Sequence, residues 1–239
     1  MKIQEKKEVY GKLEKEAYYL YLLKGFGIPK IISYGFSGNY NILIEESLGK
    51  SLEQLFQENK NKPKIIRIKD MVMAGIQIIE RLEFMHSKNI IHRDIKPNTF
   101  VVGNPDTSVI YIYDFGFAKK YRSSKTGKHI KFSKNSKFSV NLKFSSVNSM
   151  EGVESSRRDD MESFGYMLIY LYNQELPWEK FKTKNINEIG QKVYDMKKSI
   201  PINLLCKNLP KEMEEYMIYV KSLKFEEDPK YNYKKKYYE

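Results

Sequence analysis

Residues 92–100 read HRDIKPNTF, and 20 residues after the aspartate of that stretch the chain reads DFG, at 114–116. The short apolar runs FVVG and VIYIY separate the two stretches, so both are expected in loops at the ends of short strands. Each stretch alone is moderately specific. Together, in this order and context, they are a strong signal, and the rest of the chain is interpreted from them.

The residue types in these loops suit phosphoryl transfer. Asp94 would orient an attacking hydroxyl and accept its proton, and the neighbouring cation Lys96 would stabilise the transferring group. Asp114, on a loop with a glycine hinge, would hold Mg²⁺ against nucleotide phosphates. Five residues after Asp94, where an asparagine would complete the metal site, the chain has Thr99, and Asn98 comes one residue too early. An altered phosphotransferase and a binding module without chemistry both remain open.

The histidines and the cysteine give weaker signals. His92 is expected to pack beneath its loop and not to act as a base, while His86 and His129 support no assignment. Cys206 is the single cysteine, and we expect a small buried hydrophobic residue there and not a nucleophile. None of these residues forms a cluster with the spacing of a zinc site.

Composition bounds the protein class. A chain of 239 residues can build one sizeable core or two lobes that share a cleft. It has neither an apolar stretch long enough to span a bilayer nor a secretory signal at its start. One cysteine suits a reducing compartment, so we expect a cytoplasmic or nuclear location.

The net charge of +12 is compatible with an anionic partner, but the joint abundance of Lys, Asn and Ile also fits a drift in composition. Because no aromatic residues are interleaved as a stacking platform, we do not expect nucleic acid as a partner, and we expect no membrane partner. A local imbalance is more informative. From Phe115 to Met150 the chain has nine Lys or Arg residues and no Asp or Glu.

Hydrophobic periodicity predicts a small part of strands and one helix, followed by a larger helical part, which is an α+β, two-lobed architecture. The small part has a helix at 8–24 that ends at Gly25, and a hairpin of strands 30–36 and 39–46. Residues 117–150, rich in Ser, Lys and Asn, are predicted to be an exposed loop. The helices of the larger part are predicted near 51–60, 68–89, 159–173, 186–198 and 211–222.

Four stretches resemble one known family: residues 27–56, 84–103, 112–122 and 145–178. The most diagnostic is SSVNSMEGVESSRRDDMESFGYMLIYLYNQELPW, at 145–178. In it Ser146, Val147 and Asn148 stand where most protein kinases carry Ala-Pro-Glu and where the casein kinase I family carries Ser-Ile-Asn. The chain resembles that family of serine/threonine protein kinases over nearly its whole length.

The resemblance implies one kinase domain over 1–239, with a partial N-lobe at 1–46, a hinge at 47–50 and a C-lobe at 51–239. Asp94 and Lys96 resemble the catalytic residues, and Asp114 and Thr99 occupy the metal-binding positions. The resemblance implies ATP and Mg²⁺ as cofactors. The nucleotide-binding positions are Lys2, Glu16, Glu46, Leu48 and Asp114, with Lys6 or Lys7 as alternatives to Lys2.

The implied activity is transfer of the ATP γ-phosphate to Ser or Thr hydroxyls of acidic or already phosphorylated proteins, by a monomer. Lys143 stands where an arginine of the family helps to bind an anion, and the basic stretch from Lys119 to Lys143 surrounds it. Lysine keeps the charge but lacks the bidentate geometry of arginine, so we expect weaker selection than in typical members.

Departures from the family favour the alternative of a catalytically impaired pseudokinase that acts as an interaction module. The sequence starts at the family's third strand, without the glycine-rich hairpin, and stops before its last helix, as in an incomplete gene or a decayed copy. Asn141 replaces a threonine near the catalytic aspartate. Glu45 occupies the gatekeeper position before the hinge, where a buried unpaired carboxylate would be costly unless the strand shifts by one residue.

Overall fold

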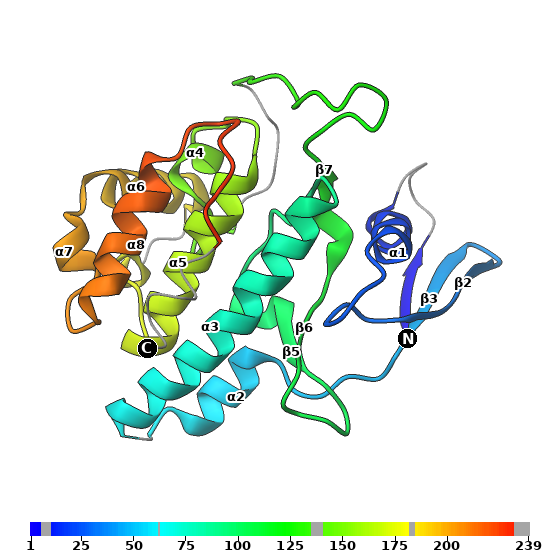
Figure 1. Cartoon of the computed structure of the whole chain (residues 1–239), viewed down its shortest axis with the longest axis horizontal. Helices are drawn as coiled ribbons and strands as arrows, with labels where there is room; N and C mark the ends of the chain where they lie inside the picture. The colour runs from blue at the N-terminus through cyan, green and yellow to red at the C-terminus, as the bar shows by residue number, and fades with distance from the viewer. Residues whose placement is uncertain (6–10, 62, 135–140, 182–184, 232–239) are drawn as a thin grey trace.

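The structure is a computed structural model that describes residues 1–5, 11–61, 63–134, 141–181 and 185–231. A small part with one three-stranded sheet lies beside a larger helical part (Figure 1). The strands are β1 (Lys2–Glu5), β2 (Ile31–Ser37), β3 (Tyr40–Glu45), β4 (Ile90–Ile91), β5 (Phe100–Val102), β6 (Ile110–Ile112) and β7 (Lys119–Lys120). The α-helices are α1 (Lys12–Leu22), α2 (Leu52–Asn59), α3 (Lys64–Ser87), α4 (Val147–Met150), α5 (Arg157–Asn173), α6 (Ile186–Ser199), α7 (Ile202–Leu205) and α8 (Lys211–Ser222). The 3-10 helices are η1 (Pro97–Thr99), η2 (Phe115–Phe117) and η3 (Pro177–Lys180).

The small part confirms the predicted hairpin and helix. Its antiparallel sheet has the order β1-β3-β2, with Lys2 opposite Leu43 and Ile31 opposite Glu45. Helix α1 packs against this sheet and against η2, so it connects the small part to the DFG loop. Residues 8–10 of the predicted helix lie outside the described residues, as do Lys6 and Lys7.

Helix α5 is central to the larger part, where it packs against α3 and α8 (Figure 1). The helix is buried on nearly all its faces, as expected for a helix whose residues are apolar on most sides. Gly165 allows the close approach of α8, because a Cβ atom there would lie 2.3 Å from the sulfur of Met217. The predicted helix at 159–173 is therefore confirmed as the core of the larger part.

Residues 46–51 connect β3 to α2 and are tied to β5. The Gly49 N–H donates to the Val102 carbonyl at 2.8 Å, and the Val102 N–H donates to the Lys50 carbonyl at 3.0 Å. A Cβ atom at Gly49 would come within 3.0 Å of the Gly103 carbonyl oxygen, so the close approach of these segments favours glycine. Helix α2 then begins with a capping box formed by Ser51 and Gln54.

The prediction of an exposed loop over 117–150 is wrong at its two ends. Residues 123–128 and 131–134 are exposed and form no helix or strand, as predicted, and residues 135–140 lie outside the described residues. Strand β7 pairs with β4, the helix α4 forms at 147–150, and the side chains of Tyr121 and Phe144 are buried. These two aromatic residues anchor a segment whose composition is otherwise polar. Helix α3 begins at Lys64, four residues before the predicted start.

Candidate active site

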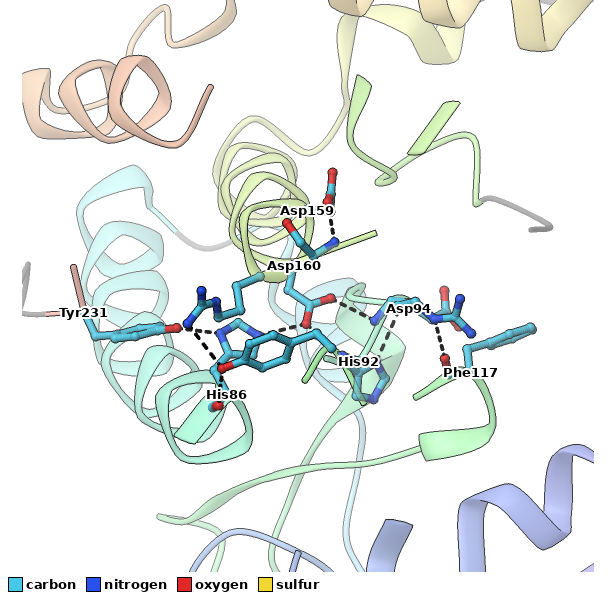
Figure 2. Close-up of polar contacts among 11 residues, drawn as sticks. His86, His92, Asp94, Phe117, Asp159, Asp160 and Tyr231 are labelled. Carbon is cyan, nitrogen blue, oxygen red and sulfur yellow. Dashed lines mark hydrogen bonds and ion pairs between the residues drawn. The ribbon is translucent and has the colours of Figure 1, made fainter. Parts of the chain in front are cut away.

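The backbone of the HRD loop is held by Asp160, in the first turn of α5 (Figure 2). Its carboxylate accepts the backbone N–H of His92 at 2.7 Å and that of Arg93 at 2.8 Å. These bonds hold Arg93 at φ 69°, a left-handed conformation that costs free energy outside glycine. The loop conformation is thus imposed by a side chain 66 residues after Asp94 in the sequence.

Asp160 is itself held by a chain of polar contacts (Figure 2). His86 Nε2 lies 3.0 Å from its Oδ2, and the other ring nitrogen of His86 lies 2.7 Å from the hydroxyl of Tyr231. Burial alone would raise the pKa of Asp160, but the contacts with His86 and His92 outweigh it and lower the pKa below its usual value. Asp160 is therefore a buried, charged anchor for the loop.

Asp94 and Lys96 lie together on this loop. The Lys96 ammonium is 2.5 Å from Asp94 Oδ2, and the Asp94 side chain is only 8% exposed. His92 is fully buried beneath them: its Nδ1 accepts the Asp94 N–H, and its Nε2 lies 3.1 Å from the Tyr113 carbonyl oxygen. The expected structural role of His92 is confirmed.

Thr99 and Asn98 point in different directions. The Thr99 hydroxyl donates to the Asp94 carbonyl at 2.7 Å, and Thr99 is fully buried. Asn98 is exposed, and its Oδ1 accepts a hydrogen bond of 3.4 Å from the Ser51 hydroxyl at the start of α2. Asn98 therefore faces away from the position that Thr99 fills and does not substitute for it.

Asp114 lies between β6 and η2 in a left-handed conformation, with φ 62° and ψ 70°. The buried ring of Phe115 packs against His92, with ring centroids 5.4 Å apart. Gly116 lies against α1, where an added Cβ atom would be 3.4 Å from the Cβ of Lys12. Packing on both sides thus holds Asp114 in a conformation that is uncommon outside glycine. Residues in such conformations cluster at functional sites.

Lys2 on β1 pairs with Glu16 on α1, at 2.6 Å between Nζ and Oε1. Lys2 is also 3.3 Å from Oε1 of Glu45, and its ammonium lies 3.7 Å from the centroid of the Tyr113 ring. Burial disfavours the charge of Lys2, but Glu16 and Glu45 outweigh this and raise the pKa of Lys2. Glu45 is thus buried, with its Oε1 paired to Lys2 and its Oε2 without a hydrogen-bond partner among the described residues.

The two positions near the hinge that are expected to contact nucleotide are Glu46 and Leu48. The Glu46 backbone N–H donates to the Lys30 carbonyl at 2.9 Å, and its carboxylate accepts the Lys30 N–H at 2.7 Å. Leu48 is half-buried in the connection to α2. Both lie on the segment that joins the two parts of the molecule.

Several cations of the basic stretch are paired with carboxylates from other elements. Lys119 pairs with Glu154 at 2.9 Å and Lys143 with Glu179 at 2.6 Å. The other oxygen of Glu179 accepts the Leu176 N–H, so this carboxylate is held in place. Among the described residues of the stretch, the exposed lysines are Lys125, Lys128, Lys131 and Lys134.

The donor atoms suit magnesium only in part. Mg²⁺ prefers oxygen ligands, and it is commonly held by one or two carboxylates together with substrate phosphates and water. Within the described ranges, no group of three or more His, Cys, Asp or Glu residues could hold an ion. The Asp114 carboxylate fits one ligand position, whereas the Thr99 side chain is fully buried and its hydroxyl is directed at the Asp94 carbonyl. The residues fit one ion shared with phosphates better than a second ion.

Interpretation of the sequence missed Asp160, His86 and Tyr231. The motif SRRDD contains Asp160, but nothing in the sequence indicated that its partners would be His92 and His86. Cys206 follows the expectation, because it is buried and burial raises the pKa of its thiol to about 12. None of the described helices is long and apolar enough to cross a membrane.

The described geometry agrees with a comparison of the whole chain against known families. The family model of the protein kinase domain matches residues 1–229. This range includes the three-stranded sheet, the loops that carry Asp94 and Asp114, and the helices that follow them. A match over nearly the entire chain means that the chain belongs to the protein kinase domain family.

Proposed function

We propose that the chain is a serine/threonine protein kinase of the casein kinase I type that uses ATP and Mg²⁺. The observation that carries the proposal is the pairing of Asp94 and Lys96 on a loop that Asp160 holds in a single backbone conformation. A pre-organised carboxylate and cation are what phosphoryl transfer requires from a protein, because most of its catalysis is positioning and charge stabilisation.

In this mechanism the Asp94 carboxylate orients the substrate hydroxyl. The hydroxyl oxygen forms a bond to the γ-phosphorus of ATP while the bond from that phosphorus to the bridging oxygen breaks, and ADP leaves. Asp94 accepts the hydroxyl proton, and Lys96 stabilises charge on the transferring group. Lys2, oriented by Glu16, binds the other phosphates. Asp114 would hold a bound Mg²⁺, which would supply further neutralisation of the phosphate charge.

The proposed substrates are acidic or phosphorylated proteins. The exposed Lys125, Lys128, Lys131 and Lys134 support this class, because cations on one loop attract anionic peptides. Lys143 contributes less, since Glu179 already neutralises it. We also propose a reducing compartment, cytoplasmic or nuclear, and a monomer.

A second candidate function is that of a pseudokinase, a protein-interaction module with impaired catalysis. The geometry of Thr99 favours it, because this side chain braces Asp94 and brings no carboxamide to the metal site. Glu45 favours it too, because it places a second carboxylate on the lysine that would bind phosphate.

Incorporation of labelled phosphate into acidic, phosphorylated and neutral peptides tests the two candidates. The kinase proposal expects transfer that requires Mg²⁺, favours the anionic peptides at low salt and is lost in Asp94→Asn. Glu58→Gln, an exposed change on α2, is the control and should retain transfer. If the folded chain transfers no more phosphate than Asp94→Asn does, the kinase proposal is wrong and the pseudokinase candidate stands.

A further inference from the structure

Glu45 gives the proposed phosphate-binding lysine a second carboxylate partner. The Lys2 ammonium has three N–H donors, and it already lies 2.6 Å from Glu16 and 3.3 Å from Glu45. The Glu45 side chain is only 5% exposed, so water screens this contact weakly. A phosphate oxygen that approaches Lys2 therefore competes with two carboxylates.

The second oxygen of Glu45 has no compensating contact. Its Oε2 is buried and has no hydrogen-bond partner among the described residues. A buried carboxylate oxygen without a partner costs free energy of folding. An uncharged side chain at the end of β3 would avoid this cost, so stability alone does not account for Glu45.

The charges around Lys2 are unbalanced. Glu16 and Glu45 both lie against the one Lys2 ammonium, and the influence of nearby carboxylates appears in the pKa of Glu16. Burial raises that pKa most, Lys2 opposes the rise, and Asp114 and Glu45 add to it. Two carboxylates against one ammonium leave an excess of negative charge beside the lysine that is proposed to bind the nucleotide phosphates.

We propose that Glu45 makes this site selective for the metal-bound form of the nucleotide, by repelling phosphate charge that no cation has neutralised. The inference rests on the proposed function, in which Lys2 binds nucleotide phosphates. Coulomb repulsion grows with the charge of the ligand, and metal-free ATP carries more negative charge than its magnesium complex. Glu45 therefore weakens the binding of metal-free ATP more than the binding of Mg-ATP. It affects which form of the nucleotide binds, and it does not affect the chemical step.

Titration calorimetry of the full chain tests the inference, with ATP in excess Mg²⁺ and ATP in EDTA as the two ligands. Glu45→Gln removes the charge and keeps the shape of the side chain. We expect it to tighten the binding of ATP in EDTA by about tenfold or more, and that of Mg-ATP by a smaller factor, so that the ratio of the two Kd values falls. Glu58→Gln, which removes an exposed carboxylate paired with Lys50, should leave the ratio unchanged.

The thermal midpoint of each variant separates specificity from structural support. We expect Glu45→Gln to be at least as stable as the parent chain, because it removes a buried charge of which one oxygen has no partner among the described residues, and Glu45→Met repeats the test with an apolar side chain. An unchanged ratio in both variants, or weaker binding together with a lower midpoint, overturns the inference but leaves the kinase proposal intact if the parent chain binds Mg-ATP. If the parent chain binds neither form, both the inference and the kinase proposal fail.

Discussion

The hydroxyl of Thr99 donates a hydrogen bond of 2.7 Å to the backbone carbonyl of Asp94. Thr99, which stands at the proposed second metal-binding position, thus contacts the residue that is proposed to accept the substrate proton. Its fully buried side chain stabilises the HRD loop from inside.

Thr99→Asn should raise the rate of phosphate transfer if the second metal site limits the reaction. An asparagine adds a carbonyl ligand, and one charge-stabilising group at such a site is worth roughly a hundredfold in rate. The measurement is kcat for an acidic peptide as a function of Mg²⁺ concentration. Asp94→Asn on the same background should remove the gain. A Thr99→Asn chain that matches the parent at every Mg²⁺ concentration would show that threonine is a sufficient ligand.

Asp160→Asn should destabilise the fold by about 3 kcal/mol or more, because breaking a buried charged network leaves its donors unpaired. The lowered pKa of Asp160 adds a pH dependence. Its contribution is present above the usual aspartate pKa and is lost as the pH falls through the lower pKa of the folded state. Urea unfolding measures both effects. Asp195→Asn, on the outer face of α6, is the control and should change stability by less than about 0.5 kcal/mol.

Lys197 on α6 should make stability rise with pH above neutrality. It is fully buried, its ammonium donates to the carbonyls of Leu142 and Ser145, and burial lowers its pKa to about 7. Between that value and the usual 10.5 the unfolded chain holds one more proton than the folded chain, so stability rises by up to about 1.4 kcal/mol per pH unit.

The comparison of Lys197→Met with the parent chain isolates this effect. Urea unfolding at pH 6, 7.5 and 9 should show a steeper rise for the parent than for Lys197→Met, which lacks the titrating group. Lys192→Met, an exposed change on the same helix, should retain the parent slope. Equal slopes for the parent chain and Lys197→Met would exclude the titration of Lys197.

Glu179→Gln should increase the preference for phosphorylated peptides. In the parent chain Glu179 holds the Lys143 ammonium at 2.6 Å, above the ring of Tyr170, so a substrate anion must displace it. The variant frees the cation at little cost in stability, since a partly exposed pair is worth about 0.2–1 kcal/mol. The ratio of kcat/KM for phosphorylated and unphosphorylated versions of one peptide should rise several-fold. Lys143→Gln on the same background should cancel the rise.

The sequence predicted those elements whose pattern is local. The hairpin around Gly38 and the helix α5 follow from periodicity. The pairing of Glu16 with Lys2, for which Lys6 and Lys7 were the alternatives, follows from the resemblance to a known family. The two ends of the segment 117–150 were misjudged because a two-residue strand has no periodicity, and single aromatic anchors are hidden among polar neighbours.

The residues that hold the HRD loop in place could not be predicted for a related reason. His86 and Asp160 lie 74 residues apart, and nothing in the local sequence of either indicates the other. The sequence shows that Thr99 stands where an asparagine is expected, but the direction of the Thr99 hydroxyl depends on the position of the Asp94 backbone carbonyl. The contact of His86 with Asp160 arises only when the helices α3 and α5 pack together.

The chain of contacts from Tyr231 through His86 to Asp160 has a consequence for biosynthesis. Tyr231 lies 145 residues after its partner His86, and a ribosome delivers the chain from its N-terminus at about 5–20 residues per second. The HRD loop therefore leaves the ribosome long before its last support does. The nascent chain can form α3 and the sheet early, but the network around its proposed catalytic loop closes only when residue 231 has emerged. A message or a ribosome that stops short of this tyrosine yields a chain with Asp94 present and its network unfinished.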